Sequence, residues 1–180
     1  LTSGVAHDFN NLLTVVLGNI GFIERKLSEA GIDGNTSRRL GYMRAAAERG
    51  GVDRVIYFDE EEMVEVEIPG ALFFRKAKIF KPFLDADRVI NLPKMKNHLA
   101  GTVTLGLKNW NGIIHNVHPS GQQQDVHRID LGQKFADLYR VRKADLTFID
   151  GIIAMEGQGP HVGTPVEMNL FIAGADTVAV

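Results

Sequence analysis

Apolar positions in the first fifty residues recur with helical spacing. From Val5 to Leu27 they fall three or four residues apart, which forms one continuous stripe along an amphipathic helix. Gly31 ends this predicted helix, and a second helix with a weaker apolar face runs up to Gly50-Gly51. A helical hairpin of this length has little core of its own. Its apolar stripe is therefore expected to pack on another subunit or another domain.

After Gly51 the pattern changes to short apolar or alternating runs separated by periodic stretches. The predicted strands cover residues 54–58, 63–68, 87–92, 146–150, 152–155 and 168–173, and the predicted helices cover residues 78–84, 99–107 and 127–139. Strands that alternate with helices favour an α/β fold in which helices layer on a mainly parallel sheet. Because the pattern begins and stops abruptly, we expect an incomplete sheet, truncated at both ends.

Composition narrows the classes of function. The 180 residues carry a net charge of -2, which argues against a generic nucleic-acid-binding protein. The chain has no cysteine, so it forms no disulfide and supplies no thiolate to a zinc ion or an iron–sulfur cluster. No stretch approaches the roughly 18 apolar residues of a membrane span. No signal peptide is visible either, and a cytoplasmic location is the expectation.

One stretch of the first predicted helix carries specific chemistry. Asp8 can accept a hydrogen bond from one ring nitrogen of His7 and thereby raise the nucleophilicity of the other. Asn11 lies one helical turn after His7, where an amide can position a phosphoryl group or its magnesium ion. The pattern predicts a phosphoacceptor histidine. The alternative is a lone histidine on an ordinary amphipathic helix.

The run A-H-D-F-N-N-L-L at residues 6–13 resembles the H-box of two-component sensor histidine kinases. The resemblance implies that residues 1–50 form a dimerisation and phosphoacceptor hairpin, which makes a homodimer through a four-helix bundle. It also implies a response regulator or a partner kinase as the source of phosphate. No ATP-binding kinase domain follows the hairpin, so we expect that the chain does not phosphorylate itself.

Residues 92–124 contain no aspartate or glutamate, although the chain as a whole is acidic. Such an acid-free run predicts a surface that binds anions. Part of it directly follows a predicted strand, and the ligand sites of open α/β sheets lie at the carboxyl ends of strands. We expect a phosphate or carboxylate ligand at Lys94, Lys96 and Lys108, with His98 as an acid, a base or a metal ligand.

A second group of polar residues lies near the end of the predicted sheet. Asp150 and Glu156 bracket a short predicted strand, and Gly157 and Gly159 form a loop whose amides can approach a ligand closely. The alternative is that the two acids are ordinary turn and cap residues.

Three histidines have a spacing that suits a divalent metal such as zinc or nickel. His115 and His118 are separated by two residues, and His127 follows nine residues later. The alternative is that all three are solvated histidines of a polar loop. Trp110 likewise has two interpretations, stacking on a ligand beside Lys108 or packing in the core.

Three blocks of the chain, at residues 89–98, 101–109 and 144–160, resemble the family called domain of unknown function 362. The resemblance runs from residue 52 to residue 180. It implies that the site is lined by Lys94, Lys96, His98, Lys108, Asn109, Asp150 and Glu156. Complete members of this family often occur beside ferredoxin-like iron–sulfur modules, which implies an association with redox chemistry.

The sequence thus predicts a phosphoacceptor hairpin at residues 1–50 and an α/β domain at residues 52–180. No linker rich in proline or serine separates them, so we expect a fusion of two unrelated gene fragments at Gly50-Gly51. The main functional prediction is an α/β domain with a site for a small anion or a metal. The alternative is a phosphorelay module centred on His7.

Overall fold

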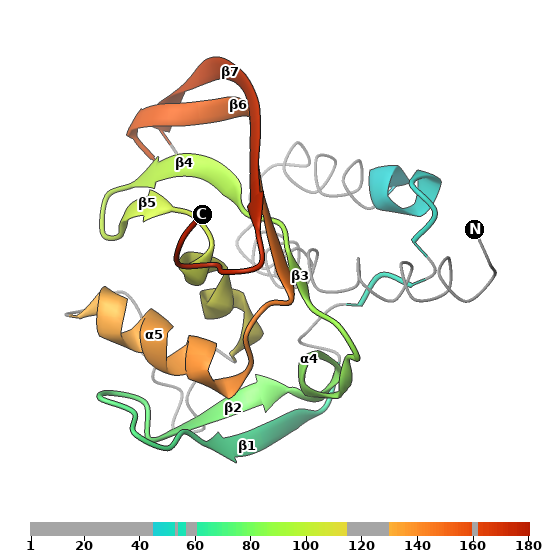
Figure 1. Ribbon diagram of the computed structural model, residues 1–180, viewed down its shortest axis with the longest axis vertical. Coiled ribbons are helices and arrows are strands. Elements are labelled where there is room, and N and C mark those ends of the chain that lie inside the picture. Colours follow the sequence, from blue (N-terminus) through green and yellow to red (C-terminus); the bar gives the residue numbers. More distant parts are fainter. Residues whose placement is uncertain (1–44, 53, 57–60, 115–129, 160–161) are drawn as a thin grey trace, which may run out of the picture.

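The computed structural model describes residues 45–52, 54–56, 61–114, 130–159 and 162–180. Its labelled elements, in chain order, are β1 (Met63–Glu67), β2 (Lys76–Phe80), α4 (Lys81–Asp85), β3 (Ile90–Asn91), β4 (Lys94–His98), β5 (Thr102–Thr104), the 3₁₀ helix η3 (Leu107–Ile113), α5 (Leu131–Val141), β6 (Leu146–Gln158) and β7 (Val162–Gly174). Figure 1 shows three layers, with the larger sheet at the top, η3 and α5 in the middle and the β1–β2 hairpin below.

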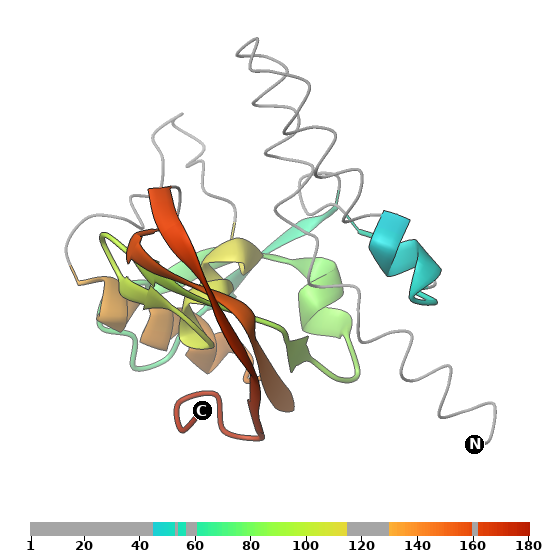
Figure 2. The same cartoon turned by 90° about the horizontal axis from the view of Figure 1, so that it is seen from above.

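The larger sheet has five strands and is mixed. Strand β6 pairs in parallel with β3 and β4, whereas β5 and β7 join the sheet in antiparallel orientation. The prediction of an α/β fold is confirmed, but the sheet is only partly parallel. The reason lies in the connections, because the short link from β6 to β7 permits only an antiparallel hairpin. Figure 2 shows the twist of this long β6–β7 ribbon from above.

Strands β3 and β4 follow one another along the same side of β6, and Pro93 lies in the break between them. Register shows this arrangement, because Asp150 of β6 faces Lys94 on one side and Phe171 of β7 on the other. Pro93 is fully buried and has no N–H to give to the ladder, but its carbonyl accepts the amide of Asp150 at 2.9 Å. The strand predicted at residues 87–92 is therefore only two residues long. The residues expected just beyond its end form a strand of their own.

Two predicted helices need correction. Residues 78–80 complete β2, because alternate burial of Ala77 and Ile79 follows the period of a strand, and α4 begins only at Lys81. Residues 99–107 contain a turn and β5 rather than a helix. Gly101 and Gly106 break any helical continuity there, and the β-branched residues between them favour pairing with β4.

The prediction at residues 63–68 is confirmed as β1, and the acidic face of its hairpin is solvated. Lys76 of β2 bridges Glu65 and Glu67 of β1 across exposed positions. Residues 54–56 form no strand, and the rest of the strand predicted there lies outside the described residues.

Helix α5 confirms the helix predicted at residues 127–139, of which residues 127–129 lie outside the described part. It buries a carboxylate as well as an apolar face. The side chain of Asp137 is 1% exposed and accepts three backbone N–H groups, at 3.0 Å from Leu72, 2.7 Å from Phe73 and 3.0 Å from Phe74. This carboxylate fixes the loop between β1 and β2 on the helix.

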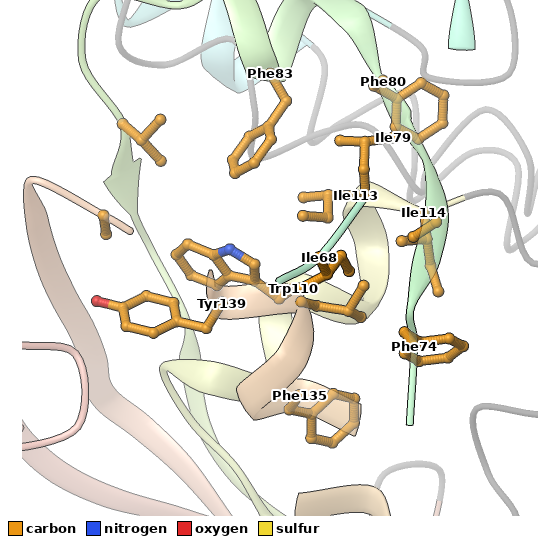
Figure 3. Close-up of a cluster of buried hydrophobic side chains, with 14 of the residues drawn as sticks. Ile68, Phe74, Ile79, Phe80, Phe83, Trp110, Ile113, Ile114, Phe135 and Tyr139 are labelled. Atoms are coloured by element: carbon orange, nitrogen blue, oxygen red, sulfur yellow. The ribbon is translucent and has the colours of Figure 1, made fainter. Parts of the chain in front are cut away.

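The hydrophobic core lies between α5, η3, α4 and β2, below the larger sheet. Figure 3 shows the indole of Trp110 between Phe83 and Tyr139, with ring centroids 6.1 Å and 4.9 Å away. The indole N–H donates to the carbonyl of Arg142 at 2.9 Å. Trp110 is 2% exposed, so of its two interpretations the structure supports core packing.

Residues 45–49 are helical, and the helix ends where the sequence predicts. The amide of Val52 bonds the carbonyl of Ala47, and that of Gly51 bonds Glu48, with Gly51 at φ 89°. This is a Schellman ending, in which glycine takes the left-handed position. The rest of the predicted hairpin, with His7, Asp8 and Asn11, lies outside the described residues.

Candidate anion-binding site

Strand β4 positions the first group of predicted site residues. Successive side chains of a strand point to opposite faces, so Lys94, Lys96 and His98 share one face. The pairing of β4 with β6 is irregular between Lys94 and Lys96, so the two lysines nevertheless face different residues of β6. Lys94 lies opposite Asp150 of β6, whereas Lys96 lies opposite Met155, five residues further along β6.

Lys94 and Asp150 neutralise each other. The ammonium of Lys94 donates to one carboxylate oxygen of Asp150 at 2.7 Å, and the other oxygen accepts the amide of Ile152 at 3.0 Å. The hydrogen bond from Lys94 is the main cause that lowers the pKa of Asp150. Both side chains are more than a third exposed, so this is a surface ion pair.

Lys96 and Lys108 have the opposite arrangement. Burial, followed by the positive charge of Lys96, lowers the pKa of Lys108. Lys96 comes from β4 and Lys108 from η3, and the stem of Lys108 reaches Gly101 in the turn after β4. Within the part of the chain that the structure describes, neither ammonium forms an ion pair.

The stem of Lys108 is held between the turn after β4 and helix α5. A Cβ atom on Gly101 would lie 3.5 Å from Cε and 3.6 Å from Cδ of Lys108. On the other side, the ammonium lies 5.9 Å from the ring centroid of Phe135. The half-buried amine therefore has defined neighbours rather than the freedom of a surface lysine.

His98 lies at the same turn, with its ring near the stem of Lys108. Its Nδ1 accepts the amides of Ala100 and Gly101, each at 3.1 Å. In this arrangement Nδ1 of the ring is the acceptor for the backbone of the turn. The same Nδ1 is 3.7 Å from the Cβ position of Gly101, which places His98 beside Lys108.

Thr104 is a neighbour of Lys96 that sequence reasoning missed. It faces Lys96 directly across the β4–β5 ladder and is 8% exposed. Its hydroxyl oxygen is buried and has no hydrogen-bond partner among the described residues. The alternation of residues 102–104 could have revealed a strand, but only its register with β4 shows that Thr104 faces the lysine.

The remaining predicted site residues lie in other surroundings. The amide of Asn109 donates to Asn91 at 2.9 Å, and Asn91 in turn donates to the carbonyl of Gly106, so this network fastens η3 to β3. Glu156 is exposed on the β6–β7 ribbon opposite Thr164. Asp150 and Glu156 belong to one long strand rather than bracketing a short one.

The predicted metal ligands His115, His118 and His127 lie outside the described residues. In the described ranges, no group of three or more histidines, aspartates or glutamates has the arrangement of a metal site. Those same ranges contain no helix that is long and apolar enough to cross a membrane.

Comparisons with known proteins give one family and one relative. The family model described as "Domain of unknown function (DUF362)" matches residues 11–180. The thylakoid-associated protein sll1697 of Synechocystis sp. (strain ATCC 27184 / PCC 6803 / Kazusa) is 36% identical over 110 residues. This alignment covers 59% of the present chain and 34% of that protein, so the chain spans about a third of that relative's length. No solved structure matches.

The family match also bears on the predicted boundary after residue 50. It begins at residue 11 and runs across Gly50-Gly51, where the sequence predicted a junction between unrelated segments. Nothing supports a histidine-kinase segment in residues 1–50.

Proposed function

Because the chain belongs to the DUF362 family, whose description assigns no activity, we propose from its own residues that the domain binds a small anion at Lys96 and Lys108. The observation that carries the proposal is that the stem of Lys108 lies against Gly101 in the turn after β4, the strand that carries Lys96, while neither lysine forms an ion pair in the described residues. The ligand class is a phosphate or a carboxylate.

Without a ligand, the surroundings of the Lys108 ammonium are unfavourable for its charge. Bringing like charges together and removing one of them from water both disfavour the charged amine. An anion placed between the two ammonium groups reverses both effects, because it supplies opposite charge and hydrogen-bond acceptors. The hydroxyl of Thr104 supports the proposal, since a bound oxyanion or its water would give this buried group a partner.

Lys94 is left out of the proposed site, although the sequence suggested it. Its charge is already matched by Asp150, so an anion there would have to compete with a bonded carboxylate. Two lysines of the same strand, Lys94 and Lys96, should therefore respond differently to substitution.

The test is thermal unfolding of the full chain with inorganic phosphate or acetate, against sodium chloride at equal ionic strength. A ligand that binds only the folded state raises the melting temperature as its concentration rises above Kd. We expect the rise with at least one of the two anions, and its loss in Lys96→Met and in Lys108→Met.

The matched control is Lys94→Met, which should keep the anion-dependent rise. Equal rises in all four proteins would place any binding elsewhere. The absence of a rise with either anion in the unsubstituted chain would overturn the proposal.

A further inference from the structure

The larger sheet has one fully buried face and one face that is only partly buried. Along β6 the burial alternates, because Thr147 and Ile149 are 0% exposed whereas Leu146 and Phe148 are half-buried. Figure 1 shows η3 and α5 on the buried side of this sheet. The opposite side, which we call the outer face, carries five apolar side chains from three strands: Ile90, Leu146, Phe148, Phe171 and Ala173.

The register of the strands gathers these side chains on the outer face. Residues that lie directly opposite each other in a sheet point to the same side. Ile90 of β3 lies opposite Leu146 of β6. Phe148 of β6 lies opposite Ala173 of β7, and its ring contacts that of Phe171 with centroids 4.8 Å apart. Phe171 is 51% exposed, so the outer face presents apolar surface at its β7 side.

The direction of the strands indicates that this face belongs under a further layer. Strand β6 pairs in parallel with β3 and β4 in the part that carries the outer face. Parallel parts of a sheet are normally covered on both faces, and an apolar sheet face is stabilised by packing against another layer. The outer face therefore calls for an occupant with an apolar surface of its own.

We propose that the outer face is covered by the apolar stripe of residues 5–27 of the same chain, a segment outside the described residues. The sequence predicts a helix there, with apolar positions that recur three or four residues apart. A helix of this length extends about 35 Å, at 1.5 Å per residue, and neighbouring strands lie about 5 Å apart. The stripe is thus long enough to cross all the strands of the outer face.

Two observations favour a segment of the same chain over a second copy. The family model matches from residue 11 onward, so most of the stripe falls within the matched domain that also contains the sheet. The chain that follows is anchored in the protein, since Val52 is 9% exposed and Ile56, at 7%, belongs to the core. A tethered segment has an effective concentration on the order of 1 mM, which is roughly a hundredfold advantage over a second copy at about 10 µM protein.

The polar side of the predicted helix suits the same arrangement. At 3.6 residues per turn, His7 and Thr14 lie on the side opposite the stripe. Packing of the stripe on the outer face leaves this polar side in contact with water. The proposal is therefore independent of whether His7 accepts phosphate.

The experiment is crosslinking between chosen positions of the full chain, which contains no cysteine of its own. Ala173→Cys marks the outer face, and Ala136→Cys marks an exposed position of α5 on the other side of the sheet. Each is combined in turn with Leu12→Cys, Ile20→Cys or Ile23→Cys in the stripe. A short bismaleimide joins neighbouring cysteines, and denaturing electrophoresis with peptide mass mapping separates links within a chain from links between chains.

We expect at least one stripe position to crosslink within the chain to Ala173→Cys. The rate should be at least about tenfold higher than to Ala136→Cys, because docking raises the effective concentration of one cysteine near the other. Adding Val16→Asp, which puts a charge into the stripe, should slow this link by a similar factor. Thr14→Asp, which puts the same charge on the opposite side of the helix, is the matched control and should leave the rate unchanged.

Three outcomes would overturn the proposal. Links to Ala173→Cys that form mainly between chains would place a second copy on the outer face. Equal rates to Ala173→Cys and Ala136→Cys would mean that the stripe has no fixed place on the sheet. The absence of a link to Ala173→Cys from all three stripe positions would remove the stripe from the outer face altogether.

Discussion

Two regions of this protein place charge inside the fold in opposite ways. On α5, the carboxylate of Asp137 is almost completely buried, and three amides of the loop between β1 and β2 donate to it. At Lys96 and Lys108, by contrast, no carboxylate of the described residues forms an ion pair, and burial together with the charge of Lys96 lowers the pKa of Lys108. The first charge is satisfied by the protein itself, and the second pair is not.

The comparison separates a charge that stabilises this fold from a pair of charges that we propose to bind a ligand. A buried charge whose hydrogen bonds are all made stabilises one conformation of the chain. Like charges held together destabilise the free protein and are relieved only by something from outside. Substitutions in the two regions should therefore change the free energy of unfolding in opposite directions.

The largest effect is expected from Asp137→Ala. The substitution leaves three amides without their acceptor, so we expect the free energy of unfolding to fall by about 3 kcal/mol. Urea unfolding measures this loss. Asp87→Ala, which changes an exposed carboxylate, is the matched control and should cost less than about 0.5 kcal/mol. Similar losses in both variants would remove the special role of the buried carboxylate.

The opposite sign is expected for Lys108→Met without ligand. Methionine keeps an apolar stem of similar length but removes the half-buried charge next to Lys96. We expect the free energy of unfolding at neutral pH to rise, on the order of 1 kcal/mol. Urea unfolding at low ionic strength is the measurement, since salt screens the repulsion. A loss of stability would show that the Lys108 ammonium makes favourable interactions that outweigh its burial and the repulsion from Lys96.

A smaller effect is expected at the ion pair of Lys94 and Asp150. Asp150→Asn should lower the free energy of unfolding by roughly 0.5 kcal/mol, because both partners are exposed and screened. The pKa of Asp150 is lowered from 3.8, so its contribution is present above pH 3.8 and is lost as the pH falls through the folded-state value. Acid unfolding of the two proteins should therefore converge at low pH.

The smallest effect is a pH dependence at alkaline pH. The folded-state pKa of Lys108 is below 10.5, so between that value and 10.5 the unfolded chain binds more protons. The stability of the unsubstituted protein, relative to Lys108→Met, should accordingly rise with pH in this window. In Lys96→Met the rise should be smaller, because one cause of the lowered pKa is gone. An equal rise in both backgrounds would mean that burial alone lowers the pKa.

The periodicity of the sequence predicted those helices and strands that bury one face and expose the other. The helix at α5 and the strand at β1 follow because their burial patterns repeat with the periods of a helix and a half-exposed strand. The helix predicted at residues 99–107 failed because its apolar spacing also fits a turn, a short strand and a 3₁₀ helix. Sheet direction was not predictable either, since the predicted strands at residues 152–155 and 168–173 left room for a crossover, whereas the longer β6 and β7 leave only a short hairpin link.

The sequence was enough to name residues of the candidate site, but not to say which residues lie beside each of them. The acid-free run drew attention to Lys94, Lys96 and Lys108, but the sequence treated them as equivalent. Their difference arises from the register irregularity between β4 and β6, which puts Asp150 beside one lysine and Met155 beside the other. Thr104 was missed for the same reason, because cross-strand neighbours depend on register rather than on sequence distance.

The position of Trp110 has an optical consequence. It is the single tryptophan of the chain, and its indole is in contact with α4 through Phe83 and with α5 through Tyr139. Intrinsic fluorescence excited at the indole therefore reports on one buried point where several elements meet. Because Lys108 lies two residues earlier in the same 3₁₀ helix, that emission offers a way to follow occupation of the proposed anion site without any attached dye.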